Sequence, residues 1–520
     1  MIRRFRSSPN GTLETNNNVK SKNQLLAYAN IIRFSANRIT SNQMAICLFF
    51  LLLFLLSYQP ASGEDPRQTM SFTVENLCPI LAANRDYLSA AERDAFFRCG
   101  EVKIQTADGQ TYDDLSDDQL NALSNMSGDE ASVAETVSVQ LSGPQRQVLT
   151  LRLQALRKGS GGGLAMNRNN KPHEPVLLAG PVTALSGTDL DQSTLSDNGR
   201  LGFFITGSFA NGKKDESTVE PGFDYTNTAA TAGMDYRFTD QFIAGLAAGY
   251  SAVKAELDAN SGESDVTGYA VSLYSTYHLE QLYLNGMVTA GWRDYESERN
   301  LNYTITRNPS DPLAPTNPLT TVDQTFKGDS NATEFSASLG GGYDLYAGGL
   351  TFGPYVSANY FKTTIDAFSE DLATENTNDG FGLALHYDKQ DVESFTTNVG
   401  AMMSYAVSTG LGIFSPYIRA DWEHEYNDET DDIKARFADV HADWEFEEDD
   451  DGDEDSVQEA VANNLIIVPT ENPDADLYNL SIGLSATFPY GMSAFADYTT
   501  ILGLKDFTYQ QVVGGLRFEF

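Results

Sequence analysis

The chain ends in Val512-Val513-Gly514-Gly515-Leu516-Arg517-Phe518-Glu519-Phe520, and the order of side chains in this stretch decides the fold. Successive side chains of a β-strand point to opposite faces, so one face here is apolar and the other carries Arg517 and Glu519. A strand of this kind fits the wall of a closed membrane barrel, which faces lipid outside and water inside. The apolar face consists of Val512, Leu516, Phe518 and Phe520.

The same alternation recurs through the chain from Arg200 onward. In the clearest example, Tyr478, Leu480 and Ile482 share one face. Small polar residues occupy the opposite face, which we assign to the watery interior. Twelve segments alternate in this way, an even number, as a barrel of antiparallel hairpins requires. They lie near 200–212, 222–238, 242–256, 264–278, 282–304, 329–346, 350–366, 391–408, 411–427, 474–489, 491–504 and 508–520.

The connections between these segments alternate in length. Several are short turns, whereas the connections 305–328, 367–390 and 428–473 are long. Short turns at one end and long loops at the other are typical of outer-membrane barrels. A soluble β-sandwich would alternate too, but it does not account for the aromatic terminus and the loop asymmetry together. We therefore predict an all-β fold, a twelve-stranded antiparallel transmembrane β-barrel over residues 199–520. The short turns are at 239–241, 279–281, 347–349, 409–410 and 490.

Charge and hydropathy agree with a barrel and exclude one class of function. The chain of 520 residues has 34 basic and 72 acidic residues, a net charge of −38. Nucleic-acid binding needs a basic surface, so we do not expect it. Mean hydropathy is −0.32, which is too polar for a bundle of membrane helices. A barrel hides about half of each strand from lipid, so its average stays polar.

The N-terminus has the pattern of an export signal. Ala45–Leu56 is the one continuously apolar segment, and its twelve residues are too few for a transmembrane helix, which needs about twenty. A basic region precedes it, and Ala61-Ser62-Gly63 follows at the spacing of a cleavage site. Residues 1–63 are therefore predicted to be a secretory signal peptide. The basic region is long, which indicates either an extended signal or a start codon placed too far upstream.

Residues 64–198 lack the alternating pattern of the later segments. Their sequence predicts a small α-helical region ahead of the barrel. Ser89-Ala-Ala-Glu92 and Ser116-Asp-Asp-Gln119 are capping boxes, each of which opens a short helix. We expect the first of these helices to end at Cys99. A proline opens a further predicted helix over Gln145–Lys158, and a glycine-rich linker follows it.

The cysteine count favours one disulfide. Cys47 lies in the predicted signal peptide, which leaves Cys78 and Cys99. An even pair in an exported chain favours a disulfide, and this one would clamp two of the predicted helices. Two reduced, buried thiols are the alternative. A metal site is disfavoured because no histidine or third cysteine lies nearby.

Several segments together resemble the β-barrel translocator domain of autotransporters, the type V secreted proteins of Gram-negative bacteria. The resemblance runs from about Gly199 to Phe520, and no single segment carries it alone. The segments are Gly222–Asn227, Ala232–Asp240, Gly245–Tyr250, Asp391–Ser394, Pro416–Trp422, Ala494–Tyr498 and Gly515–Phe520.

The resemblance implies export by the secretion translocon, insertion by the barrel-assembly machinery and contact with outer-membrane lipid. That machinery recognises a C-terminal strand with a final aromatic residue, a signal matched here by Leu516, Phe518 and Phe520. The resemblance also implies that the segment before the first strand threads the lumen and tethers a passenger outside. Passengers of this family are often long β-solenoids. Here about 130 residues lie between the predicted signal peptide and the barrel, and they show no repeats.

Charged residues on inward positions are candidates for holding a helix in the lumen by ion pairs. Arginines of the predicted helix Gln145–Lys158 are suitable counterparts for charges on the barrel wall. A stretch nearer to the first strand, 182–199, is the alternative occupant of the lumen. The candidates are Arg146, Arg152 and Arg157 on the helix and Asp235, Arg237, Arg419, Asp421, Arg517 and Glu519 on the wall.

We predict no catalytic, cofactor-binding or metal-binding residue. The sequence has no motif of a serine hydrolase, a P-loop protein or a zinc protease. Asp421, Glu423 and His424 lie near one strand end, where charged residues usually form a wet rim. The connection 428–473 holds seventeen acidic and two basic residues, but Gln458 stands where an EF-hand needs a bidentate glutamate. We expect a solvated, self-repelling loop there.

Three functions remain open. The first is a non-enzymatic, monomeric autotransporter-like barrel that anchors, and translocates or displays, its own residues 64–198 as a passenger or linker. The second is a channel or structural barrel that its N-terminal segment plugs. The third, a surface hydrolase with His424 in its site, has the weakest support.

Overall fold

The computed structural model describes residues 65–102, 111–158, 200–306, 319–374, 378–427, 430–440, 464–489 and 491–520. The chain divides into two units, Met1–Ser62 and Gly63–Phe520, and only the second contains described residues. The predicted signal peptide, with its cleavage site at Ala61 and Gly63, lies outside the described residues, as does the stretch 182–199. No helix in the described part of the chain is long and apolar enough to cross a membrane.

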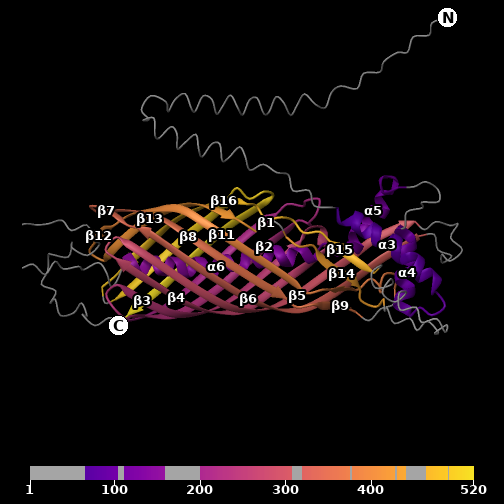
Figure 1. Cartoon of the computed structure of the whole chain (residues 1–520), viewed down its shortest axis with the longest axis horizontal. Helices are drawn as coiled ribbons and strands as arrows, with labels where there is room; N and C mark the ends of the chain where they lie inside the picture. The colour runs from indigo at the N-terminus through magenta and orange to yellow at the C-terminus, as the bar shows by residue number, and fades with distance from the viewer. Residues whose placement is uncertain are drawn as a thin grey trace, which may run out of the picture. The chain divides into compact units, whose positions relative to one another are not determined.

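Twelve antiparallel strands from the described residues close into a barrel, which confirms the predicted fold class (Figure 1). The last strand pairs with the first, from Gly202 opposite Glu519 to Lys214 opposite Phe507. Because every strand of the ring is paired on both sides, the sheet has no open edge. In ring order the strands are β1 (Leu201–Lys214), β2 (Phe223–Arg237), β3 (Phe242–Leu257), β4 (Gly262–Leu279), β5 (Leu282–Thr306), β6 (Leu319–Tyr343), β8 (Leu350–Ile365), β11 (Gln390–Tyr405), β13 (Gly412–Glu425), β16 (Asp476–Thr487), β17 (Met492–Leu502) and β18 (Phe507–Glu519).

The two faces of the strands differ as the C-terminal stretch predicts. On β18, Leu516 and Phe518, followed by Phe520, are exposed on the outer surface, while Arg517 is 5% exposed and lies in the lumen. Exposed Leu, Val, Phe and Tyr side chains cover a broad band of the outer surface on the other strands as well. A band of this kind is what an outer-membrane barrel presents to lipid.

The two ends of the barrel carry different connections. At one end tight turns join the strands, for example 238–241 and 280–281, and the short strands β7 (Leu345–Ala347) and β12 (Val407–Thr409) lie in two of these connections. We call this the short-turn end; β1 begins and β18 ends there. The opposite end, which we call the long-loop end, carries the longer connections. The 3₁₀ turn η3 (Asp258–Asn260) lies in the connection between β3 and β4.

The long connections are more ordered than the sequence analysis predicts. The predicted loop 305–328 is wrong at both ends, because β5 continues to Thr306 and β6 starts at Leu319. The reason is burial: Ile305 and Val322 on these extensions, with Tyr303 just before the first of them, pack into an apolar core with the N-terminal helices. The loop 428–473 also begins and ends in strands, so the expectation of a fully solvated loop is wrong there; its acidic centre, 441–463, lies outside the described residues.

Four short strands from the connections 367–390 and 428–473 form a further layer at the long-loop end. β10 pairs with β9 and β14, and β14 pairs with β15. β9 also pairs with the extension of β6, which joins this layer to the barrel wall. The strands are β9 (Phe368–Leu372), β10 (Leu385–Tyr387), β14 (Ile433–Phe437) and β15 (Leu465–Val468).

Three N-terminal helices form what we call the cap: α3 (Pro66–Ala83), α4 (Ala90–Val102) and α5 (Asp117–Ser127). Both predicted capping boxes are present, at Ser89 to Glu92 and at Ser116 to Gln119. The helix predicted to end at Cys99 runs on to Val102. The predicted disulfide is confirmed: Cys78 on α3 and Cys99 on α4 are joined, with their Cα atoms 5.8 Å apart. The 3₁₀ turn η2 (Tyr112–Asp114) leads into α5.

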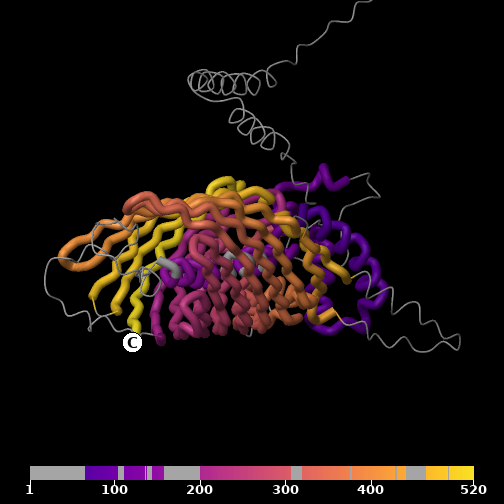
Figure 2. The backbone as a smooth tube through the Cα atoms, turned by 60° about the vertical axis from the view of Figure 1, so that its left-hand side comes forward, coloured from indigo at the N-terminus to yellow at the C-terminus, as the bar shows by residue number. Residues whose placement is uncertain are grey.

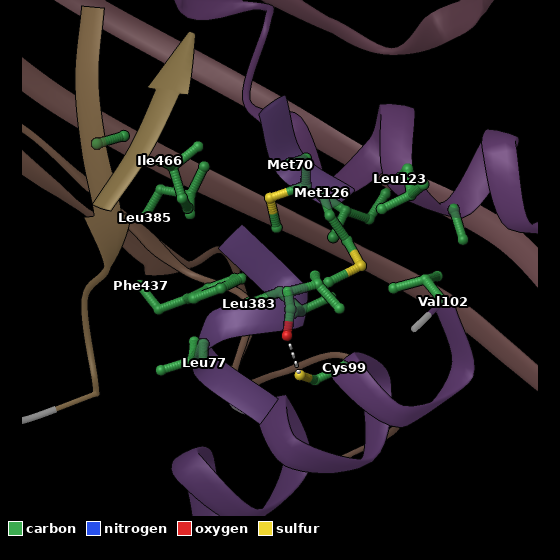
Figure 3. Close-up of a cluster of buried hydrophobic side chains, with 14 of the residues drawn as sticks. Met70, Leu77, Cys99, Val102, Leu123, Met126, Leu383, Leu385, Phe437 and Ile466 are labelled. Carbon is green, nitrogen blue, oxygen red and sulfur yellow. Dashed lines mark hydrogen bonds between the residues drawn. The ribbon is translucent and has the colours of Figure 1, made fainter. Parts of the chain in front are cut away.

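The cap and the long-loop end share one apolar core (Figure 3). Met70, Leu77 and Leu123 from the cap meet Leu385 of β10 and Phe437 of β14, and all five are buried. The close-up also shows Ile466 of β15 beside these side chains. Because the helices and the strands bury apolar surface against each other, neither half of this core is complete alone.

The last helix, α6 (Ala131–Lys158), lies inside the barrel (Figures 1 and 2). It starts well before the predicted Gln145, and its backbone stays helical through Gly143 and Pro144. Proline is favoured in the first turn of a helix, which is why the sequence suggested a start there. A proline inside a helix costs about 3 kcal/mol, so packing in the lumen offsets that cost here.

Candidate functional site

The lumen with α6 is the first half of the candidate site, and contacts at both ends of the helix define its direction. Thr136 donates a hydrogen bond to Glu220, which lies in the connection between β1 and β2 at the long-loop end (2.8 Å between Oγ1 and Oε1). Arg152 contacts Asp235, near the end of β2 at the short-turn end. α6 therefore runs down the lumen from the long-loop end toward the short-turn end.

Apolar side chains of α6 pack against the inner wall on two sides. Leu149, Leu153 and Leu156 form a buried cluster with Phe204 and Tyr274. On another side of the helix, Val148 and Leu151 pack against Met402, Tyr417 and Val513. Burial of apolar side chains of this size contributes about 1.5–3 kcal/mol each. The lumen around this part of α6 is therefore packed with protein and is not an open water channel.

Polar side chains of α6 bond to inward hydroxyls and amides of the wall. Gln145 donates to Ser272 of β4 (3.2 Å between Nε2 and Oγ). Gln147 donates to Asp497 and to Thr499 of β17, at 3.0 and 2.6 Å. A Cβ atom at Gly249 of β3 would lie 2.2 Å from Oε1 of Gln145, so the amide end of Gln145 lies directly against the wall at this glycine. These bonds fix how far α6 is inserted and how it is turned.

A buried charge cluster joins α6 to the seam between the first and last strands. The Nε of Arg152 lies 3.0 Å from Oδ2 of Asp235, and Nη2 of Arg517 lies 3.4 Å from Oδ1 of the same carboxylate. The hydroxyl of Tyr274 also donates to this carboxylate at 3.4 Å. The guanidinium of Arg152 stacks over the ring of Phe204 at 5.2 Å. One carboxylate is therefore shared between two buried arginines.

The other predicted lumen charges fall into two groups. Arg237 and Arg517 both pair with Glu519, at 3.5 and 2.7 Å, which extends the cluster around the end of the barrel seam. Arg146 of α6 lies 3.7 Å from Glu423, a wall residue that was not among the predicted ion pairs.

The structure does not place the remaining candidates in ion pairs with α6. Arg419 donates to Ser481 (2.8 Å), and Asp421 accepts bonds from Tyr355, Asn398 and Asn479. Both belong to the hydrogen-bonded lining of the wall itself. The side chain of Arg157 lies outside the described residues.

The candidate catalytic residues Asp421, Glu423 and His424 do not form a site. Alternation on β13 sends Asp421 and Glu423 into the lumen and His424 to the outer face, so a hypothesis that needs all three together is wrong. His424 instead pairs with Asp476 (2.9 Å from Nδ1 to Oδ1) beside Trp422 and Tyr426. Among the described residues, no group of three or more His, Cys, Asp or Glu side chains is arranged to hold a metal ion.

A buried carboxyl, Glu220, lies where α6 enters the lumen, between Thr136 of the helix and Lys214 of β1. Glu471 contacts Lys214 from the other side and adds a second negative charge. Burial raises the pKa of Glu220 to about 7 from an ordinary value of 4.5, although Lys214 and Thr136 act in the opposite direction. The folded protein therefore holds a proton on this carboxyl at a pH where the unfolded chain has lost it.

The stability of the folded protein is expected to fall as the pH rises from about 4.5 to about 7, and to stay level above that range. A shift of this size corresponds to roughly 3 kcal/mol in the free energy of unfolding. Glu220→Gln should remove this pH dependence and stabilise the protein at pH 8. Denaturant unfolding of the folded protein in detergent at pH 5 and pH 8 measures the effect. Glu216→Gln, an exposed residue of the same connection, should keep the wild-type dependence; equal behaviour of the two variants would contradict the assignment.

Contacts of the cap with the long-loop end are the second half of the candidate site. Arg299 on β5 is 3% exposed and donates to Glu370 of β9 (2.8 Å), to the carbonyl oxygen of Leu383 (2.9 Å) and to that of Asn125 at the end of α5 (3.0 Å). The side chain of Asn125 accepts in turn from the backbone of Asn302 on β5 (2.8 Å). One arginine thus ties the barrel wall, the outer layer and the cap together.

The other cap helices are bound by their own contacts. Asp94 of α4 accepts hydrogen bonds from the backbone N–H groups of Gly380 and Gly382, at 3.2 and 2.9 Å. Thr69 and Thr73 of α3 donate to the carbonyl oxygens of Ile467 and Leu465, both at 2.8 Å. These two threonines cover the outer edge of β15, and covered edges do not recruit foreign strands.

A close approach between α5 and β10 requires glycine at position 128. Gly128 ends α5 with a φ of 71°, in the left-handed region. A Cβ atom there would lie 2.6 Å from Leu385 and 2.7 Å from Tyr387. The turn from the cap into α6 therefore rests directly on the outer layer, which couples the position of α6 to that of the cap.

Sequence reasoning missed Arg299, Glu370, Asp94 and Glu220. A signal existed for Arg299, since it occupies an inward position within the predicted strand 282–304. Glu370, Asp94 and Glu220 lie in connections or in the cap, and their partners are distant in the sequence. Local patterns carry no information about such pairs.

Comparison with known protein families decides what this barrel is. Residues 203–446 match a family model described as the autotransporter β-domain. The barrel is an autotransporter β-domain. As such it belongs in the outer membrane of a Gram-negative bacterium.

Solved structures similar to this autotransporter β-domain include other autotransporters. The translocator domain of NalP from Neisseria meningitidis has a TM-score of 0.44 and 12% identity, and the match covers 63% of this chain and 91% of that one. The transport unit of AIDA-I from Escherichia coli has a TM-score of 0.38 and 15% identity, with 65% and 94% covered.

Two curated relatives share part of the sequence. Esterase EstA of Pseudomonas aeruginosa and that of Pseudomonas putida are each 27% identical over 206 residues, which is 39% of this chain and 28% of the relative. The chain therefore spans less than a third of the length of these relatives.

Proposed function

We propose that this chain is a self-displaying autotransporter, whose β-domain carries its own N-terminal region to the cell surface and keeps it there as a fixed cap. The observation that carries the proposal is the core that the cap shares with the long-loop end, combined with the course of α6 through the lumen. In outer-membrane barrels the long loops are extracellular and the short turns face the periplasm. A cap at the long-loop end is then outside the cell.

The path of the chain supports this reading. The cap comes first in the sequence, α6 descends through the lumen, and β1 starts at the short-turn end. This is the path expected of a segment that was carried outward through the barrel while its C-terminal end stayed in the periplasm. We propose further that α6 remains in place afterwards and closes the lumen, held by the Arg152–Asp235 pair and by the apolar contacts of Leu149 and Leu153.

We propose that the cap stays attached and is not released as a free passenger. A released passenger needs a core of its own, whereas this cap completes its core with residues of β10, β14 and β15. The buried Arg299 network and the two threonine bonds to β15 add directional contacts. The proposed role of the cap is therefore a permanent cover over the outer mouth of the barrel.

We propose no catalytic activity for this chain. The relatives named esterase match it over 28% of their own length, so that activity is not carried over. The separation of His424 from Asp421 and Glu423 on opposite faces of β13 supports a non-enzymatic role. A plugged channel is the second candidate, and the packed lumen favours it equally; the two proposals differ in whether the cap is outside the cell.

Cysteine labelling of intact cells separates the two. Asp113→Cys places a thiol on an exposed residue of η2, the turn that leads into α5 of the cap, and Asp240→Cys places one in the turn between β2 and β3 at the short-turn end. With a membrane-impermeant maleimide under non-reducing conditions, the cap variant should be labelled on intact cells. The turn variant should be labelled only after the outer membrane is permeabilised. Labelling of the cap only after permeabilisation would contradict surface display and support an internal plug.

A further inference from the structure

The outer surface of the barrel carries two rows of aromatic side chains that mark the lipid-facing band. Nearer the long-loop end lie Tyr269 of β4, Trp292 of β5 and Phe335 of β6. Nearer the short-turn end lie Tyr277 of β4 and Tyr343 of β6. Outer-membrane barrels place such girdles at the two interfaces of an apolar band about 25 Å tall. Outward side chains between these rows therefore face hydrocarbon.

A groove of about 470 Å³ crosses β4, β5, β6 and β8 in this band and is bounded by Phe395 of β11. Small outward residues form its floor, namely Ser275 of β4, Gly286 of β5, Ala337 of β6 and Ala358 of β8. The register places Ser275 opposite Gly286, and Leu339 lies opposite both Gly286 and Ala358. Larger side chains stand along the margins: Leu273, Val288, Leu339, Tyr360 and Phe395.

The small residues in the floor of the groove are not required for packing within the barrel wall. A Cβ atom at Gly286 would meet only the hydroxyl oxygen of Ser275, at 3.7 Å, which is an ordinary contact. At Gly245, by contrast, a Cβ atom would lie 2.4 Å from the ring of Tyr274, so that glycine is required by the wall. The wall around Gly286 thus has room for a side chain that the sequence does not supply.

The position of the groove decides what occupies it. It is open to the lipid-facing side, and its margins and floor are apolar apart from the hydroxyls of Ser275 and Tyr360. Tyr360 lies opposite Phe395 in the register, and its ring lies beside Phe335 of the aromatic row near the long-loop end, with 6.4 Å between ring centroids. The groove therefore opens in the outer half of the membrane and descends from there toward the middle of the band.

We infer that this groove binds one acyl chain of an outer-leaflet lipid. An acyl chain fills the space between Leu273, Val288 and Leu339 that a flat strand surface would leave as a void. Lys362 on β8, two residues beyond Tyr360 toward the long-loop end, lies at headgroup level and pairs with Glu393 (2.6 Å). The bound chain enters beside this charged pair.

The test fills the groove without changing the character of the surface. The variant G286L/A358L adds two apolar side chains on the outward face, where they do not disturb the lumen. The matched control, A230L/A232L, makes the same chemical change at two outward alanines of β2, away from the groove. Full-length protein is purified from outer membranes, stripped of lipid in detergent and titrated with lipid A. Native mass spectrometry counts the lipid molecules that each protein retains.

Wild type and A230L/A232L should each retain one more lipid A molecule than G286L/A358L. Heat-modifiable migration on gels checks that all three are folded. Equal retention by wild type and the filled variant overturns the inference. Equal retention of phosphatidylethanolamine in place of lipid A overturns the assignment to an outer-leaflet lipid. The choice of an outer-leaflet lipid rests on the proposed orientation, with the long-loop end outside the cell. Retention itself is measured on purified protein, so it can fail while labelling of intact cells still shows the cap outside.

Discussion

Asp235→Ala is expected to lower the free energy of unfolding of the barrel by about 3–5 kcal/mol, because it removes the shared partner of two buried arginines. Arg152 and Arg517 are 3% and 5% exposed, so water cannot hydrate either guanidinium in place of the lost carboxylate. Arg517 keeps Glu519 at 2.7 Å, whereas Arg152 is left with the neutral hydroxyl of Tyr274, the ring of Phe204 and the like charge of Arg517. The main consequence is an uncompensated buried charge on α6, near the short-turn end of the lumen.

Denaturant unfolding of the detergent-solubilised protein measures this effect. Asp224→Ala is the matched control, since it is an exposed aspartate on the outward face of the same strand, and it should change stability by less than about 0.5 kcal/mol. The double variant R152M/D235A removes the stranded charge along with its partner and should recover most of the loss. If the double variant is no more stable than D235A, the charge pair does not hold α6 in the lumen.

The second large effect is expected from Phe326→Ala on β6. Phe326 is fully buried in the core shared by the cap and the long-loop end, and the guanidinium of Arg299 stacks on its ring at 5.1 Å. Loss of a buried phenylalanine costs about 3–5 kcal/mol. Because Phe326 lies on the barrel side of that core, the cost falls on the docking of α3, α4 and α5. We expect the cap to loosen while the barrel below stays closed.

Hydrogen exchange of the cap amides, compared with those of β1 and β18, measures this directly. Protection of α3–α5 should fall by about two to three orders of magnitude, with little change in the barrel seam. Phe335→Ala is the control on the same strand, since its side chain is exposed on the lipid-facing surface and makes no contact with the cap core. Equal loosening of the cap in both variants would show that the shared core does not hold it.

The barrel could be predicted from the sequence because apolar and polar side chains alternate along the strands. In the C-terminal strand the inward Arg517 is charged and the outward Leu516 and Phe518 are apolar, so the sequence alone indicates which face meets lipid. The prediction stopped short on β5 and β6, where the outward residues become polar above the lipid band. There the strand pattern depends on Ile305 and Val322, and their burial comes from helices much earlier in the chain.

Part of the candidate site could also be predicted, because inward charges are recognisable from the alternation along a strand. Asp235 and Arg152 stand out as charges within otherwise apolar or small-residue patterns, and the structure places them together. The start of α6 was misplaced because Pro144 resembles a helix start when only local sequence is considered. The bonds of Arg299 and Asp94 join segments that meet only after the barrel has closed, and no local pattern indicates them.

The shared core of the cap has a consequence for the order of assembly. α4 has 13 residues and α5 has 11, lengths at which isolated helices are marginal in water. Much of the apolar surface that would stabilise them is supplied by strands that exist only once the sheet is complete. On the proposed route through the barrel, this region would therefore travel as an incompletely folded chain and take up its final structure only against the finished barrel. The disulfide between α3 and α4 would hold these two helices together on that route, which limits how far the region can extend.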